Sequence, residues 1–197
     1  MLFRSGTGLL SLMIPQKFTS VDIAAIEIDQ RAADQASENI LRCHWAKKVR
    51  VYNTDIKKIE PDHTFDCVVS NPPFYEQDLL GPDQQKNEAH HDATLPFSEL
   101  IIQLERLLTK DGKFYLILPA KGIDARIDTL EKHGLFIQTK LNVHHDCEHP
   151  MMRVLLEGNR VRTEQKFTEQ INIHETNEDY SERFRGDRKS TRLNSSH

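Results

Sequence analysis

Short apolar runs alternate along the chain with longer runs that have helical spacing. The apolar runs are rich in β-branched residues and stop at polar or turn-forming residues, which is typical of buried strands. Such runs cover residues 21–28, 49–55, 65–70, 113–119, 136–143 and 152–157, and one further short strand is expected within 167–174. Apolar residues three or four positions apart predict helices at residues 29–43, 95–108 and 123–133. Strands that alternate with helices predict an α/β fold around a parallel sheet.

Turn and cap residues mark where several of these elements begin and end. Asp29 is placed to cap the 29–43 helix, and Pro15 soon disturbs a helical run that opens after Gly8. Gly112, which follows Lys110 and Asp111, predicts the end of the 95–108 helix. Residues 75–94 are polar and lack periodicity, and a loop of this length in a compact domain is more often functional than idle.

Three predicted strands end at side chains that can hydrogen-bond a ligand. Glu27 lies at the end of the 21–28 run, Asp55 lies just beyond the next strand, and Asn71 directly follows the 65–70 run. Ligands of open α/β sheets bind at the carboxyl ends of the strands. We therefore favour ribose binding by Glu27 over the alternative of an exposed acid at a strand end. Without further information Asp55 would be interpreted as a helix cap.

Gly6, Thr7 and Gly8 form a glycine pair that opens an apolar helical run. Glycines let the backbone turn tightly and approach a ligand, and the helix start that follows offers free N–H groups to an anion. Two glycines alone are weak evidence, because turns use glycine everywhere. Their value depends on the motif downstream.

That motif is Asn71-Pro72-Pro73-Phe74. The two prolines remove two backbone donors and fix φ at both positions, so the turn is stiff and Phe74 has a defined direction. The motif resembles motif IV of the S-adenosylmethionine-dependent methyltransferases that modify exocyclic amino groups. The residues that follow narrow the resemblance to the bacterial tRNA1(Val) (adenine-N6)-methyltransferase family: Tyr75, Glu76, Pro82, Asp83, Gln84, Asn87 and the run from His91 to Phe97.

The resemblance covers residues 6–185 and implies a Rossmann-like class I methyltransferase domain. Its sheet is expected to be mostly parallel, with the first strand largely missing and an antiparallel last strand inserted next to the fifth. The family binds S-adenosyl-L-methionine, and the matching residues are Gly6, Thr7, Gly8, Glu27, Asp55 and Asn71. The matching catalytic residues are Asn71, Pro72 and Phe74, and those for substrate binding are Pro73, Phe74, Tyr75, Asn87 and His91. The implied substrate is the N6 amino group of an adenine in the tRNA(Val) anticodon loop.

Other enzymes share the Asn-Pro-Pro-aromatic geometry. Methyltransferases of ribosomal RNA guanine N2 and of a release-factor glutamine are the close alternatives. An inactive fragment is a further alternative, because Leu2 and Arg4 stand where the family's Asp-x-Gly-x-Gly-x-Gly pattern has its acid and its first glycine. We interpret residues 1–5 and 189–197 as non-native flanks of the domain.

Composition places the chain among globular proteins. Of its 197 residues 38% are hydrophobic and 28% are charged, which suits one domain with a sizeable core. No run approaches the roughly 18 apolar residues that span a membrane, and three scattered cysteines indicate reduced thiols. We predict a cytoplasmic monomer. The net charge of −4 argues against a broad basic footprint. We expect tRNA to be held by basic residues of an absent N-terminal segment, by Lys47, Lys48 and Arg50, or by residues 153–166.

The segment 144–149 contains ligand types for a metal. At strand spacing His145, Cys147 and His149 would fall on one side. The spacing matches no standard zinc pattern, however, and methyl transfer needs no metal. We predict a polar loop between two strands and no metal site.

Overall fold

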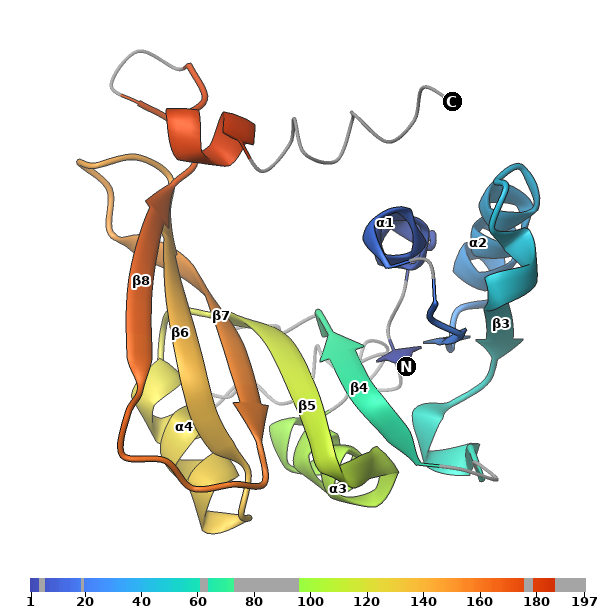
Figure 1. Ribbon diagram of the computed structural model, residues 1–197, viewed down its shortest axis with the longest axis horizontal. Helices are drawn as coiled ribbons and strands as arrows, with labels where there is room; N and C mark the ends of the chain where they lie inside the picture. The colour runs from blue at the N-terminus through green and yellow to red at the C-terminus, as the bar shows by residue number, and fades with distance from the viewer. Residues whose placement is uncertain (4–5, 19, 61–63, 73–95, 176–178, 187–197) are drawn as a thin grey trace, which may run out of the picture.

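The computed structural model describes residues 1–3, 6–18, 20–60, 64–72, 96–175 and 179–186. Within them one sheet has the strand order β3-β2-β1-β4-β5-β7-β6-β8 (Figure 1). The strands are β1 (Leu2–Phe3), β2 (Ile23–Glu27), β3 (Val49–Asn53), β4 (Phe65–Ser70), β5 (Leu108–Pro119), β6 (Phe136–His144), β7 (Met151–Asn159) and β8 (Phe167–Asn172). The helices are α1 (Leu9–Lys17), α2 (Gln30–Leu41), α3 (Phe97–Leu107) and α4 (Ile123–Lys132), with 3-10 turns η1 (Ala46–Lys48) and η2 (Ile56–Lys58).

The topology confirms the predicted sheet. Strands β3, β2, β1, β4 and β5 are parallel, and β7 lies antiparallel between β5 and β6. Strand β1 is short, as expected, and its two residues lie within the N-terminal flank set aside above. Leu2 pairs with Ala25 on one side and with Val69 on the other, so β1 occupies the middle of the sheet. Residues 189–197 lie outside the described residues.

The apolar core has two parts because successive residues of a strand face opposite sides of the sheet. Val68 belongs to the larger cluster, which α3 and α4 cover with residues such as Leu104 and Leu130. Val69, the next residue, packs on the second cluster, which includes Ala25 and Ile40. Helices therefore cover both faces of the sheet near β1. On the second face these helices are α1 and α2, which lie toward the β3 end of the sheet (Figure 1). None of the described helices is long and apolar enough to cross a membrane.

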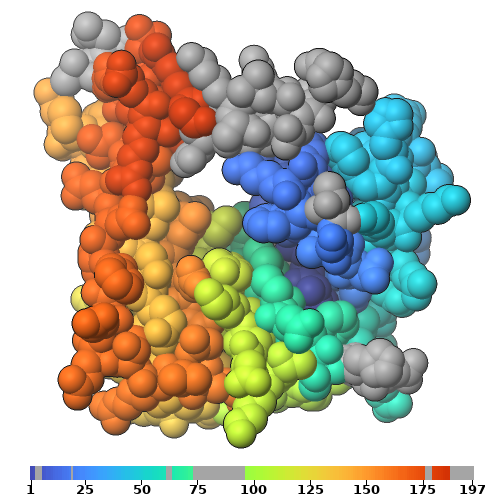
Figure 2. Space-filling view, in the orientation of Figure 1, coloured from blue at the N-terminus to red at the C-terminus, as the bar shows by residue number. Residues whose placement is uncertain are grey.

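The far half of the second face is open to solvent in the part that the structure describes. Figure 2 shows yellow-green residues of β5 at the surface between the green and the orange strands. Lys113 and Tyr115 on β5 are exposed, and Lys113 Nζ lies 2.7 Å from Glu157 Oε1 on β7. Among the described residues, helices thus cover both faces of the sheet at the amino-terminal strands, whereas the second face of β5 and β7 is exposed to solvent.

Helix α3 ends within one residue of the predicted 95–108 helix, but the stop signal predicted at Gly112 was wrong. Helix α3 stops at Leu107, and β5 begins at once with Leu108, which pairs with Phe65. The next pair in this register is Cys67 with Lys113, so the pairing of β4 with β5 is irregular between these two pairs. The residues that predicted the helix stop, 110–112, therefore lie inside β5. Gly112 is buried there against Leu108. Pairing with β4, which is distant in sequence, overrides the local turn signal.

Gly158 on β7 is a position where a side chain has no space. A Cβ at this position would overlap the ring of Phe114, which is fully buried, and would lie 2.7 Å from the carbonyl oxygen of Phe136. We predict that Gly158→Ala lowers the free energy of unfolding by about 1–3 kcal/mol, the usual cost of overpacking a core. Equilibrium denaturant unfolding measures the change.

Gly186→Ala is the matched control for this substitution. A Cβ at Gly186 would meet no atom within 4 Å. The control should change stability by no more than about 0.5 kcal/mol. Equal stability of the Gly158→Ala protein and the native chain would show that the ring of Phe114 can move aside.

Candidate active site

The carboxyl ends of β4, β1, β2 and β3 meet at one edge of the sheet. Phe3 pairs with Ser70 and with Ile26, and Ile26 pairs in turn with Tyr52. The next row along the strands therefore places Asn71 and Glu27 at the same level, with β1 between them. Since neighbouring strands are about 4.8 Å apart, the Cα atoms of Asn71 and Glu27 are separated by about 10 Å. Two predicted site residues from separate strands are thus brought together.

Glu27 is the buried carboxylate of this edge. The residue as a whole is only 5% exposed to solvent. Oε2 accepts a hydrogen bond from the backbone N–H of Gly6 at 2.8 Å, and Oε1 accepts one from the N–H of Asp29 at 3.1 Å. The carboxylate thus joins the glycine turn to the start of α2. Each oxygen keeps a second lone pair for another donor.

The glycine turn lies directly before α1. Gly6 and Gly8 have φ values of 55° and 84°, which residues with a side chain rarely adopt. A Cβ on Gly8 would lie 3.0 Å from the Cβ of Ala36, so this glycine also lets α1 approach α2 closely. Gly8 caps α1 without a side-chain hydrogen bond. The first N–H groups of α1 are therefore donors available to an anion.

Thr7 stands between the two glycines, and its carbonyl oxygen accepts a hydrogen bond of 3.1 Å from Asn39 Nδ2. Asn39 was not predicted as a site residue. Nor was Asn53, whose Nδ2 donates to the carbonyl oxygens of Glu27 and Ile28 at 3.1 and 3.2 Å. Both amides hold backbone of the site from neighbouring elements. Asn53 could have been found by its position at the end of a strand, as Glu27 was.

Asp55 lies just beyond β3, where it caps η2. Its Oδ1 accepts the N–H of Lys57 at 3.0 Å, and its Oδ2 lies 3.4 Å from Lys57 Nζ. The helix-cap interpretation is therefore confirmed. A cap uses only part of the acceptor capacity of a carboxylate, so a contact of Asp55 with a ligand stays a prediction.

Asn71 is exposed directly after β4, and Pro72 is buried. An exposed amide at a strand end beside a buried carboxylate can accept or donate hydrogen bonds to a ligand at this edge. The remaining predicted residues of the motif and loop lie outside the described residues: Pro73, Phe74, Tyr75, Asn87 and His91.

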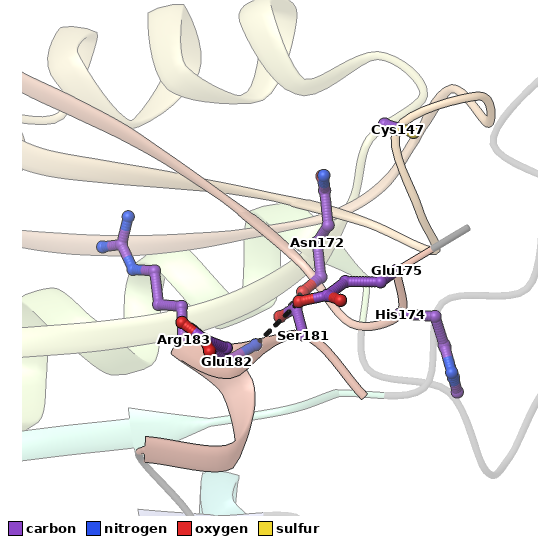
Figure 3. Close-up of a pocket in the computed structure, with 7 residues that line it drawn as sticks. All are labelled: Cys147, Asn172, His174, Glu175, Ser181, Glu182 and Arg183. Atoms are coloured by element: carbon purple, nitrogen blue, oxygen red, sulfur yellow. Dashed lines mark hydrogen bonds between the residues drawn. The ribbon is translucent and has the colours of Figure 1, made fainter. Parts of the chain in front are cut away.

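A separate pocket of about 390 Å³ lies near the end of β8 (Figure 3). Its lining comes from the β6–β7 loop, the end of β8 and the segment after it: Cys147, Asn172, His174, Glu175, Ser181, Glu182 and Arg183. None of these was predicted as a site residue. Those predicted site residues that the structure describes lie instead at the strand edge described above.

Comparison with known proteins gives related sequences and related folds. The family of the methyltransferase small domain matches residues 3–132. A tRNA1(Val) (adenine(37)-N6)-methyltransferase from Dyadobacter fermentans is 35% identical over 79% of this chain and 65% of that protein. One of the same name from Serratia proteamaculans is 32% identical over 92% of this chain and 71% of that protein.

The chain thus spans 65% of the length of the first of these relatives. Among solved structures, a predicted O-methyltransferase from Agrobacterium tumefaciens superposes with a TM-score of 0.69 at 15% identity, over 97% of this chain and 88% of that one. A methyltransferase from Pyrococcus furiosus gives a TM-score of 0.58 at 22% identity, over 82% and 74%. These structural likenesses agree with the Rossmann-like fold.

Proposed function

Since this chain belongs to the methyltransferase small domain family, and within it to the tRNA1(Val) (adenine(37)-N6)-methyltransferases, we propose that it methylates an adenine N6 in tRNA(Val). The methyl donor in this proposal is S-adenosyl-L-methionine. The observation that carries the proposal is Asn71, which follows β4 at the edge where β2 presents Glu27. The protein would act on tRNA as a cytoplasmic monomer.

The residues at this edge fit a nucleoside cofactor that bears a carboxylate. Glu27 keeps lone pairs that can accept hydrogen bonds from ribose hydroxyls. A Cβ built on Gly6 would meet no atom within 4 Å, so there is open space beside the turn. The N–H groups at the start of α1 can bind the cofactor carboxylate. Asp55 would bind the adenine amino group of the cofactor, a role that rests on the family resemblance.

The reacting amino group is a poor nucleophile, because its lone pair is delocalised into the adenine ring. In our proposal the side-chain oxygen of Asn71 and the carbonyl oxygen of Pro72 accept its two N–H hydrogens. These contacts draw the nitrogen toward tetrahedral geometry and direct its lone pair at the methyl group. S-adenosylmethionine would supply this methyl group as a sulfonium electrophile. The carbon–sulfur bond would break as the N6–carbon bond forms, and the amino proton would then leave to solvent.

Substrate binding by the residues after Pro72 completes the proposal. Phe74 would stack on the target base, and the anticodon loop makes this stacking inexpensive because its bases are already unpaired. Pro73, Tyr75, Asn87 and His91 would line the space around the base.

A labelling experiment tests the proposal directly. We expect the chain to transfer a labelled methyl group from S-adenosylmethionine to unmodified tRNA(Val), with the label recovered as N6-methyladenine. A tRNA(Val) with guanine in place of the target adenine is the matched control and should remain unlabelled. Labelling of a release factor or of ribosomal RNA instead of tRNA would support one of the alternative acceptors and contradict the proposal.

A further inference from the structure

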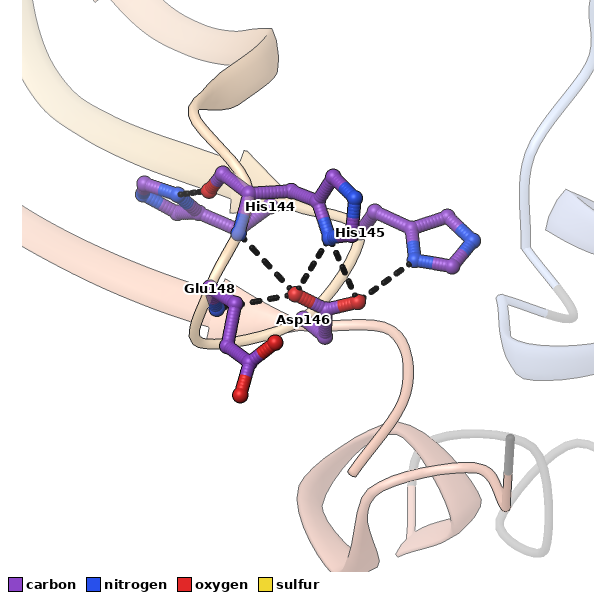
Figure 4. Close-up of polar contacts among 5 residues, drawn as sticks. His144, His145, Asp146 and Glu148 are labelled. Atoms are coloured by element: carbon purple, nitrogen blue, oxygen red, sulfur yellow. Dashed lines mark hydrogen bonds and ion pairs between the residues drawn. The ribbon is translucent and has the colours of Figure 1, made fainter. Parts of the chain in front are cut away.

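The loop between β6 and β7 places two imidazoles around one carboxylate. Asp146 Oδ2 lies 3.0 Å from His145 Nδ1, and both carboxylate oxygens of Asp146 lie 2.7 Å from His149 Nδ1. One potential ligand atom from each of the three residues lies within 4.8 Å of the other two. Figure 4 shows the carboxylate of Asp146 facing the ring of His145.

The carboxylate of Asp146 is fixed by the loop backbone as well. Oδ1 accepts the N–H groups of Glu148 and His149 at 2.8 and 3.0 Å. The side chain of Asp146 is 15% exposed, whereas those of His145 and His149 are 57% and 62% exposed. A small ion can therefore reach a pre-positioned anionic group from solvent.

Contacts outside the loop orient the ring of His145 independently. It stacks on the ring of His174 at a centroid distance of 4.7 Å, and His174 stacks in turn on Tyr180 at 4.9 Å. The backbone N–H of His174 also donates to the carbonyl oxygen of His145 at 2.8 Å. The segment after β8 thus holds one of the two imidazoles in place, which reduces the ordering that a ligand must bring about.

We propose that His145, Asp146 and His149 bind one late first-row divalent cation, with Zn²⁺ as the representative ion. Two imidazole nitrogens and one carboxylate oxygen are the donor set that such ions prefer. Tetrahedral ligands at zinc distances are about 3.3 Å apart. The nitrogen–oxygen separations of 2.7 and 3.0 Å are a few tenths of an ångström shorter, so the three side chains would move slightly apart to admit the ion. Three protein ligands leave the remaining positions for water.

Cys147 is not part of the proposed site, although strand spacing suggested it. Strand β6 ends at His144 and β7 begins at Met151, so the intervening residues form a turn and strand alternation does not apply. Cys147 instead lines the neighbouring pocket with His174 and Glu175 (Figure 3). The third ligand of the proposed site is the carboxylate of Asp146 and not the thiol of Cys147. Asp146 was not among the ligand types considered from the sequence.

A cation at this position would cross-link the β6–β7 loop and, through the His145–His174 stack, the segment that follows β8. The site shares no residue with the strand edge at Glu27 and Asn71. Its role would therefore be to stabilise the carboxyl-terminal part of the domain. The inference stands or falls separately from the proposed methyl transfer.

Equilibrium dialysis of the tag-free chain against ZnCl₂ tests the inference. We expect one tightly held Zn²⁺ per chain and a melting temperature that rises with the zinc concentration, because the ion binds only the folded loop. His149→Gln removes one ligand and should weaken binding by more than the roughly 10- to 100-fold that loss of an outer-shell partner costs. Its melting temperature without metal reports whether the loop still folds.

Two control variants separate the site from background binding by the chain's ten histidines. His133→Gln removes a single histidine that lies 3.1 Å from Glu105, and it should leave the stoichiometry unchanged. Cys147→Ser should also bind normally, and Co²⁺ should give a visible spectrum without a sulfur charge-transfer band. Failure of the native chain to bind Zn²⁺, or equal losses in His133→Gln and His149→Gln, would overturn the inference.

Discussion

Replacing Asn71 with alanine is expected to lower kcat for methyl transfer by about 10²-fold or more. This is the size of loss that follows when one positioned hydrogen-bonding group of a transition state is removed. Asn71 lies at the edge beside Glu27, where its side-chain oxygen would accept a hydrogen from the amino group that attacks the methyl carbon. The affinity for S-adenosylmethionine should change far less, because Glu27 and the glycine turn remain. Single-turnover assays and calorimetric titration measure the two quantities separately.

Asn172→Ala provides the matched control for this experiment. Asn172 lies on β8, and its buried Oδ1 has no hydrogen-bond partner among the described residues. Removal of this amide should leave kcat as in the native chain. If Asn71→Ala kept its full kcat, or if its cofactor affinity fell as much as its kcat, Asn71 would not be the group that positions the amine.

Glu27→Ala should have the largest effect on cofactor binding, and it should also destabilise the fold. A hydrogen bond to a charged group contributes about 1.5–3 kcal/mol, so the loss of ribose contacts should weaken S-adenosylmethionine binding at least about 10-fold. The N–H groups of Gly6 and Asp29 also lose their acceptor. Both N–H groups are only partly buried, so each loss should cost about 1 kcal/mol, the low end of the range for a buried donor. Calorimetry and thermal unfolding measure the two losses.

Glu38→Ala is the control for charge, since Glu38 is an exposed acid on α2. It should change neither affinity nor melting temperature. The two effects of Glu27 can also be distinguished from each other. A Glu27→Ala protein that melts earlier but binds the cofactor normally would leave Glu27 with a structural role only.

Local patterns were sufficient to predict most of the described elements and the positions of three candidate site residues. Alternation of apolar residues indicated β2, and the side chain of Asp29 caps α2 by accepting the N–H of Ala32 at 2.8 Å, as predicted. Glu27, Asp55 and Asn71 could be found because each lies at or just beyond the end of a predicted strand. Their position at a common edge follows from the parallel order of the strands, which βα alternation predicts.

Features that depend on distant residues could not be predicted in this way. Pro15 lies inside α1, although the sequence suggested that it would disturb the helix. The residue is buried, and the cost of the missing hydrogen bond is offset by packing of the helix on the sheet. The early start of β5 depends on Phe65, which lies 43 positions before Leu108. Asn39 likewise enters the site only because α2 packs beside the glycine turn.

The outer edge of the sheet has a consequence for association between molecules. Strand β8 ends the sheet, and an uncovered edge strand offers unpaired backbone groups to strands of other chains. Here the guanidinium of Arg183 donates to the carbonyl oxygen of Gln170 at 2.9 Å and pairs with Glu169. Ser181 Oγ donates to the carbonyl oxygen of Asn172 at 2.5 Å. The segment after β8 therefore shields this edge and should suppress intermolecular strand addition, the first step toward aggregation.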